Sequence, residues 1–247
     1  MGTLAFSDSV SALLGYRMIN GNKSVVAIIP AKGVSRRVPA KNLRTVGGMS
    51  LIERKIKQLS SCSLIDRVVV GSDSDEIRQI AERNGTEYLN REPYFCDESR
   101  CSANEMIEDL VSRVSGDIVL WAHCTNPFVE ASDYALALSM FSTAAADGYD
   151  SLMSVTRLQS HIWTGDKKPF NFEPLRRPHQ LASTLEPIFF QDGAIFIQPR
   201  PNMVENSYFY GLNPYFFELS QLSSLDVNTM DDLVLADCIM EKRQRSE

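Results

Sequence analysis

The 247-residue sequence has no surplus of basic residues and no long apolar run. Lysine and arginine number 25 against 31 aspartates and glutamates, a formal net charge of −6. A nucleic-acid surface needs a basic face that displaces counterions from phosphates, so this balance argues against one. No apolar run approaches the roughly 20 residues of a membrane-spanning helix. We therefore expect a protein that binds neither nucleic acid nor membrane.

Cysteine is sparse and has no pairing pattern. The five cysteines are an odd number and lack the spacing of a metal site. The N-terminus shows no charged segment that leads into a long apolar stretch. We expect reduced thiols and a cytoplasmic protein.

The chain does contain a regular alternation of apolar runs and amphipathic segments. Residues 25–30 read VVAIIP, a continuous run typical of a parallel strand covered on both faces. Helical spacing follows over residues 50–60, and a second strand-like run covers 67–72. Further strands are expected at 87–90, 118–123 and 151–156, and helices at 75–84, 102–114 and 131–146. This order predicts an α/β fold with a Rossmann-like, mostly parallel sheet flanked by helices.

The alternation breaks between residues 157 and 191. The segment shows little helical periodicity and contains four prolines, Pro169, Pro174, Pro178 and Pro187. A structureless loop of this length is uncommon in a compact domain unless it has a function. We predict an insertion here, within one α/β domain formed by residues 25–156 and 192–247.

The two ends of the chain complete the expected organisation. Residues 1–24 are expected to form an N-terminal appendage with a short helix at 7–16. The sheet is expected to resume at 193–198 with a further strand at 208–212, and the last helix at 230–242.

A basic loop follows the first apolar run. Residues 29–42 read IPAKGVSRRVPAKN and include the cations Lys32, Arg36, Arg37 and Lys41. Glycine permits close approach of the backbone, and lysine and arginine neutralise charge, so the loop suits a triphosphate. Ligands of open parallel sheets bind beyond the carboxyl ends of strands, where this loop falls. It is neither a GxxxxGK[ST] nor a GxGxxG loop, and a solvated basic turn is the alternative.

Four segments resemble those of a known family. The basic loop resembles the IPAR-G-GSK-x-x-PGKN signature of the acylneuraminate cytidylyltransferases, which include the CMP-sialic acid synthetases and have a nucleotide-diphospho-sugar transferase-like fold. Downstream, HCTNP at 123–127 is similar to QPTSP, QDGAIF at 191–196 to NGAIY, and LDVNT at 225–229 to IDIDT. The segments follow the family order over about residues 25–240.

The resemblance implies a Mg²⁺-dependent transfer of CMP from CTP to a nonulosonic, sialic-acid-like sugar acid, with release of pyrophosphate. Arg36 and Lys41 are then catalytic cations. Nucleotide contacts are expected from Ala31, Lys32, Gly33, Ser35, Arg37, Asn42, Arg91, Thr125 and Asn126. Two alternatives remain: a nucleotidyltransferase for a Kdo-like octulosonate, and a non-catalytic homologue that binds a nucleotide or a sugar.

Asp226 is the expected magnesium ligand and the third catalytic residue. A carboxylate at a strand end suits this hard cation, which offsets charge as pyrophosphate leaves. The family pattern has a second aspartate two residues later, where this chain has Asn228; an amide oxygen can also ligate Mg²⁺. The alternative is that both residues shape the turn into the last helix, with Thr229 as its N-cap.

The sugar side of the site is expected to come from two regions. His123, Gln191 and Asp192 lie in the matched segments; the alternative for His123 is that it merely finishes a buried strand. Arg176 and Arg177, in the insertion, suit a sugar carboxylate, or form a solvated basic turn. The insertion resembles the dimerisation segment of the family, so the resemblance also implies a homodimer.

Overall fold

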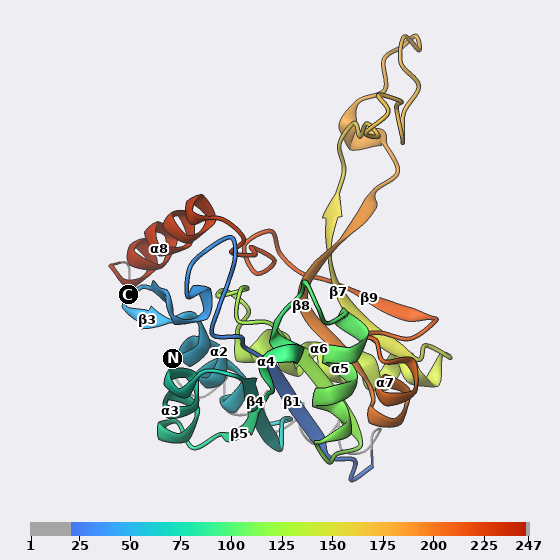
Figure 1. Cartoon of the computed structure of the whole chain (residues 1–247). Helices are drawn as coiled ribbons and strands as arrows, with labels where there is room; N and C mark the ends of the chain where they lie inside the picture. Colours follow the sequence, from blue (N-terminus) through green and yellow to red (C-terminus); the bar gives the residue numbers. More distant parts are fainter. Residues whose placement is uncertain (1–20, 246–247) are drawn as a thin grey trace, which may run out of the picture.

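The computed structural model describes residues 21–245 (Figure 1). The helix expected at residues 7–16 lies outside the described residues, as does most of the expected appendage at 1–24. No helix between residues 21 and 245 is long and apolar enough to cross a membrane.

Within the described chain, a seven-stranded sheet has the order β5-β4-β1-β6-β8-β7-β9. Its strands are β1 (Val25–Pro30), β4 (Arg67–Ser72), β5 (Glu87–Asn90), β6 (Ile118–Ala122), β7 (Ser151–Leu158), β8 (Ile188–Pro199) and β9 (Pro214–Glu218). All neighbours pair in parallel except β8, which runs antiparallel to both β6 and β7. The expected mostly parallel sheet is confirmed.

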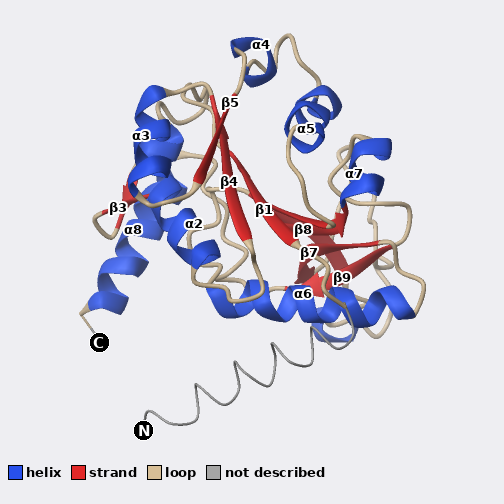
Figure 2. Ribbon diagram, turned by 90° about the horizontal axis from the view of Figure 1, so that it is seen from below, coloured by secondary structure: helices blue, strands red, loops and turns tan. Residues whose placement is uncertain are grey.

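Helices cover both faces of the sheet (Figure 2). They are α2 (Leu51–Ser60), α3 (Asp75–Arg83), α4 (Pro93–Cys96), α5 (Ala103–Ser112), α6 (Ala131–Ala146), α7 (Arg200–Asn206) and α8 (Met230–Gln244). In β1, Val25, Ala27 and Ile29 join the core under α2, α3, α6 and α8, while Val26 and Ile28 join the core under α5 and α7. The continuous apolar run of β1 is therefore explained by burial of both its faces.

Side-chain caps fix where several helices begin. Ser74 accepts a hydrogen bond from the Ile77 amide at the start of α3. Thr229 and Asp232 form a reciprocal capping box at the start of α8. The expected N-cap role of Thr229 is confirmed, and it leaves Asp226 in the segment just ahead of the helix.

The strands around the insertion are longer than expected. β7 continues to Leu158 and β8 begins at Ile188, so the two strands rise out of the sheet as an antiparallel ribbon (Figure 1). Residues 159–187 form the tip of this arm, with a single 3₁₀ turn, η2 (Ala182–Thr184). The predicted insertion at 157–191 is thus a projecting arm whose base is part of the sheet.

The prediction of a strand at residues 208–212 is wrong. Residues there turn sharply, because the Asp150 carboxylate accepts hydrogen bonds from the Leu212 amide at 2.7 Å and the Asn213 amide at 3.1 Å. The Phe209 ring in this turn packs against Trp121 and Phe196. The last strand is β9, which pairs in parallel with β7.

Candidate functional site

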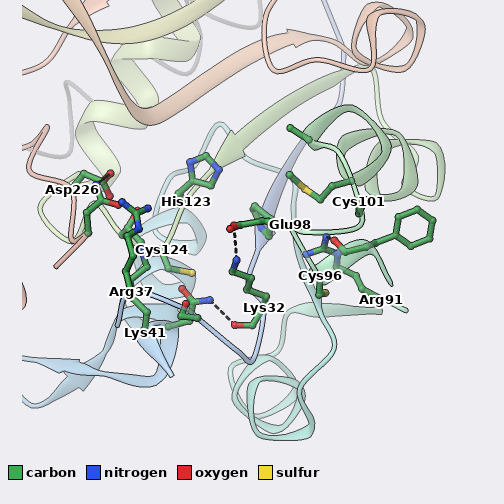
Figure 3. A pocket seen from close by; sticks show the side chains of 18 of the residues that line it. Lys32, Arg37, Lys41, Arg91, Cys96, Glu98, Cys101, His123, Cys124 and Asp226 are labelled. Atoms are coloured by element: carbon green, nitrogen blue, oxygen red, sulfur yellow. Dashed lines mark hydrogen bonds and ion pairs between the residues drawn. The ribbon is translucent and has the colours of Figure 1, made fainter. Parts of the chain in front are cut away.

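A cavity of about 550 Å³ lies beyond the carboxyl ends of β1 and β6. Its walls come from the basic loop after β1, the segment around α4, the loop after β6 and the segment before α8 (Figure 3). The predicted site residues that line it are Lys32, Ser35, Arg37, Lys41, Asn42, Arg91, His123, Thr125, Asp226 and Asn228. Four sequence segments that are far apart in the chain therefore meet at one site.

Hydrogen bonds hold the basic loop in a fixed path behind the cavity. The Asn42 side chain donates to the Lys32 carbonyl at 2.9 Å, and the Gly33 amide donates to Asp73 Oδ1 at 2.7 Å. A Cβ atom on Gly33 would lie 2.9 Å from Ser74 Cβ, so this contact requires glycine. Ala31 is buried and donates its amide to the Gly71 carbonyl at 2.9 Å. Ala31 and Gly33 thus shape the loop without lining the cavity.

Lys41 and Asn42 enter the cavity wall from a 3₁₀ turn, η1 (Lys41–Leu43). Lys41 Nζ donates to the Val227 carbonyl at 2.9 Å, which joins the basic loop to the segment that carries Asp226. Burial lowers the pKa of Lys41, and the nearby Asp226 carboxylate opposes that shift. A partly desolvated ammonium of this kind is placed to meet an anion in the cavity.

Two acidic residues that follow α4 form ion pairs with cations of the basic loop. Lys32 Nζ lies 2.5 Å from Glu98 Oε1, and Arg36 lies 3.1 Å from Asp97 Oδ1. Glu98 lines the cavity, whereas Arg36 does not. Arg36 is an exposed side chain at the rim, so its predicted place in the site is not confirmed.

The wall around α4 contains residues that the sequence patterns did not indicate. Of the lining residues here, Cys96 is the last residue of the four-residue helix α4, and Glu98 and Cys101 lie in the irregular stretch after it; neither part is long enough to show a strand or helix periodicity. Arg91, predicted from the family resemblance, is buried at the end of β5 and donates to the Phe95 carbonyl. Arg91 therefore both lines the cavity and supports this wall.

Asp226 has one carboxylate oxygen without a partner in the part of the chain that the structure describes. Its Oδ2 accepts a hydrogen bond from Asn228 Nδ2 at 2.5 Å, and its Oδ1 is buried without a hydrogen-bond partner among the described residues. Mg²⁺ is commonly bound by one or two carboxylates together with phosphate oxygens and water, so this oxygen fits an ion shared with a bound triphosphate. Residues 21–245 contain no cluster of three or more His, Cys, Asp or Glu that could hold a metal without such help.

His123 lines the cavity, but both its ring nitrogens are engaged inside the protein. Nδ1 donates to the Gly193 carbonyl at 2.7 Å, and Nε2 accepts from Trp121 Nε1 at 3.1 Å. Burial lowers the pKa of His123, which agrees with a neutral ring holding one proton. His123 therefore closes one end of the cavity as a neutral wall, with no nitrogen free to bind a sugar hydroxyl in this arrangement.

Asp192 and Asn126 lie behind the cavity. The buried Asp192 carboxylate accepts from the Ser154 hydroxyl and, at 3.1 Å, from the Ala194 amide; burial raises its pKa. Asn126 is buried, and its Nδ2 donates to the Leu225 carbonyl at 3.4 Å. Both residues support the site from behind and do not line it.

The remaining predicted sugar contacts lie away from the cavity. Gln191 is exposed on β8, and Arg176 and Arg177 are exposed in the tip of the arm, which points away from the body of the protein (Figure 1). None of the three lines the cavity of this chain.

Comparison with known proteins agrees with this geometry. The model of the cytidylyltransferase family matches residues 26–199, more than half of the chain. An N-acylneuraminate cytidylyltransferase A from Danio rerio is 23% identical over 223 residues, which cover 87% of this chain and 50% of the relative. A CMP-N,N'-diacetyllegionaminic acid synthase from Legionella pneumophila is 26% identical over 238 residues, which cover 90% of this chain and 98% of the relative. The chain thus spans about half the length of the fish relative.

Solved structures share the fold at low identity. A CMP:2-keto-3-deoxy-manno-octonic acid synthetase in complex with CTP has a TM-score of 0.63 at 13% identity, with 89% of this chain and 99% of the other covered. A 4-diphosphocytidyl-2C-methyl-D-erythritol synthase from Anaerococcus prevotii has a TM-score of 0.62 at 16% identity, with 91% of this chain and 98% of the other covered. Because the family match extends from β1 through β8 and includes the basic loop and the loop after β6, the chain belongs to the cytidylyltransferase family.

Proposed function

We propose that this protein couples CTP to a nonulosonic, sialic-acid-like sugar acid and releases pyrophosphate. One observation carries the proposal: the cations of a single loop, Lys32, Arg37 and Lys41, line the same cavity as Asp226, whose Oδ1 has no partner among residues 21–245. This combination suits a triphosphate with a bound divalent ion. The names of the fish and Legionella relatives favour acidic nine-carbon sugars as acceptors.

In the proposed reaction, the anomeric hydroxyl of a 2-keto-3-deoxy sugar acid attacks the α-phosphorus of CTP. The new O–P bond forms as the bond from the α-phosphorus to the bridging oxygen breaks, and that electron pair leaves with pyrophosphate. The hydroxyl proton passes to solvent water. Lys32, Arg37 and Lys41 hold and neutralise the phosphates, so catalysis comes mainly from positioning and charge stabilisation. A Mg²⁺ ion shared by Asp226 and the phosphates would offset charge on the leaving group.

We also propose a homodimer formed through the arm. The arm exposes Trp163 and Phe170 at its tip, and Phe189 and Phe190 are exposed on β8 at its base. Apolar side chains gathered on a projecting ribbon are typical of a protein–protein interface. In such a dimer, Arg176 and Arg177 would approach the sugar site of the partner subunit. Light scattering after size exclusion tests this, because a monomer at micromolar concentration would contradict it.

The activity is tested by incubating the protein with CTP, Mg²⁺ and a panel of sugar acids, and measuring pyrophosphate. We expect release with a nonulosonic acid and its loss in Asp226→Asn, which preserves the size of the side chain. Release with a Kdo-like octulosonate alone would establish the alternative acceptor. No product with any acceptor, combined with CTP-dependent thermal stabilisation, would identify a binding protein without this activity.

A further inference from the structure

Lys55 is a fully buried lysine behind the wall of the cavity. It lies on the inner face of α2 with 0% of its surface exposed, and its Nζ donates to the Asn126 carbonyl at 2.9 Å and to the Tyr134 hydroxyl at 2.6 Å. None of the ion pairs formed among residues 21–245 involves Lys55. A buried ammonium without a paired carboxylate is costly, so its presence calls for a physical reason.

The contacts of Lys55 lead directly to the site residues. The carbonyl oxygen of Thr125, the residue before Asn126, accepts a hydrogen bond from the Val227 amide at 2.8 Å. The Val227 carbonyl in turn accepts from Lys41 Nζ at 2.9 Å. Residues 125 and 126 are therefore joined on one side to α2 through Lys55, and on the other to the segment that carries Asp226.

Gln58 makes a comparable contact that stops short of the site. It lies one turn further along α2, is buried, and donates to the Pro127 carbonyl at 2.8 Å. Among the described residues, the Pro127 backbone makes no hydrogen bond to residues 224–228. Gln58 is thus a matched control, with the same helix, the same loop and one hydrogen bond to a carbonyl.

We infer that Lys55 is a positioning residue for the nucleotide site. It fixes residues 125 and 126 so that the Asp226 and Lys41 side chains keep their orientation in the cavity wall. The inference rests on the proposed function and adds to it a residue that touches no substrate.

The charge of Lys55 gives this role a signature that a purely structural contact lacks. Burial lowers the pKa of Lys55 to about 7. The Cys124, Glu130 and Asp133 side chains act to raise this pKa, and Arg54 acts to lower it further. Its other close neighbour, the Tyr134 hydroxyl, has a pKa raised by burial and stays neutral. An anion in the adjacent cavity favours the protonated ammonium, so nucleotide binding should take up a proton near neutral pH. CTP affinity should therefore fall as pH rises through about 7.

The experiment measures CTP affinity by calorimetry at fixed Mg²⁺ from pH 6 to 8.5 for the wild type, Lys55→Met and Gln58→Met. We expect Lys55→Met to bind CTP roughly tenfold more weakly at pH 6.5 and to lose the part of the pH dependence that Lys55 supplies. Gln58→Met should stay within about threefold of the wild type and keep its pH profile. Repeating the titrations in buffers of different ionisation enthalpy should show greater proton uptake in the wild type than in Lys55→Met.

Several results would overturn the inference. Equal losses in Lys55→Met and Gln58→Met, or a wild-type affinity that does not change with pH, would each do so while leaving CTP binding itself established. If Lys55→Met fails to fold, Lys55→Gln retains a donor without the charge, and an unchanged pH profile in that variant would also contradict the inference. A wild type that binds no CTP at any pH would instead refute the proposed function, and the inference with it.

Discussion

Asn228 Nδ2 lies 2.5 Å from Asp226 Oδ2 and donates a hydrogen bond to it. The amide therefore orients the carboxylate and leaves Asp226 Oδ1 as the unpartnered oxygen of the pair among the described residues. The family signature has an aspartate at the position of Asn228. In this chain, an uncharged donor replaces a second carboxylate, so the site has one negative charge fewer for the divalent ion of the proposed reaction.

Asn228→Asp should therefore strengthen the dependence of the protein on Mg²⁺. Without the ion, two carboxylates two residues apart repel each other and lose the orienting hydrogen bond, so we expect a loss of about 1 kcal/mol in the free energy of unfolding. With the ion, the added carboxylate should lower the Mg²⁺ concentration for half-maximal CTP binding by roughly tenfold. Thermal melts and CTP titrations across a Mg²⁺ series measure both effects. An identical Mg²⁺ requirement in the two proteins would show that residue 228 does not face the ion.

Lys41 and Arg36 were equivalent candidates in the sequence but differ in the structure. Lys41 lines the cavity and is held by the Val227 carbonyl, whereas Arg36 lies at the rim in an exposed ion pair with Asp97. We expect Lys41→Met to reduce kcat/KM by about 100-fold or more, because a desolvated cation next to the phosphates is lost. Arg36→Met should reduce it by only about threefold, because exposed pairs contribute little. Steady-state kinetics with CTP as the varied substrate checks this, and equal losses in both variants would place Arg36 at the phosphates after all.

The sequence predicted the elements of the sheet well, because a continuous apolar run such as that of β1 fits a strand buried on both faces and few other short elements. It also placed the basic loop and Asp226 at one site, because the carboxyl ends of parallel strands meet at the same edge of a sheet. It could not place Glu98 or the ribbon of β7 and β8. Glu98 lies in an irregular stretch, and the ribbon carries exposed aromatics such as Phe189 that blur the alternation of a strand.

Lys55 shows a different limit of pattern analysis. Its position on the buried face of α2 breaks the apolar stripe, and nothing in the spacing indicates that its ammonium reaches the loop after β6. Such a contact joins residues that are distant in the sequence and depends on side-chain length, which a hydrophobic period does not record.

Ala40 provides a test of backbone strain in the basic loop. It has φ 51 and ψ 39, the left-handed region, where the family signature has glycine. A left-handed alanine costs about 1–2 kcal/mol, and glycine removes that cost while losing roughly 0.5–1 kcal/mol to chain entropy. Ala40→Gly should therefore raise the free energy of unfolding by about 0.5–1 kcal/mol, measured by urea denaturation. The control is Ala146→Gly in the last turn of α6, which should destabilise the protein. Destabilisation by both substitutions would contradict a strained Ala40.

Glu98→Gln tests whether the Glu98 carboxylate competes with a bound nucleotide for the Lys32 ammonium. The Glu98 carboxylate pairs with the Lys32 ammonium, and a triphosphate entering the cavity must compete with that carboxylate for the ammonium. Removing the negative charge should tighten CTP binding by roughly two- to fivefold, a small effect because the Glu98 side chain is 71% exposed and screened by solvent. The gain should shrink as salt is raised from about 50 to about 500 mM, since screening weakens the competing pair in the wild type.

Glu92→Gln is the charge-matched control from the same segment, outside the cavity lining, and should leave the affinity unchanged. Weaker CTP binding in Glu98→Gln, with Glu92→Gln unaffected, would mean that Glu98 contributes to the bound state, for instance by orienting Lys32, and does not compete with the nucleotide.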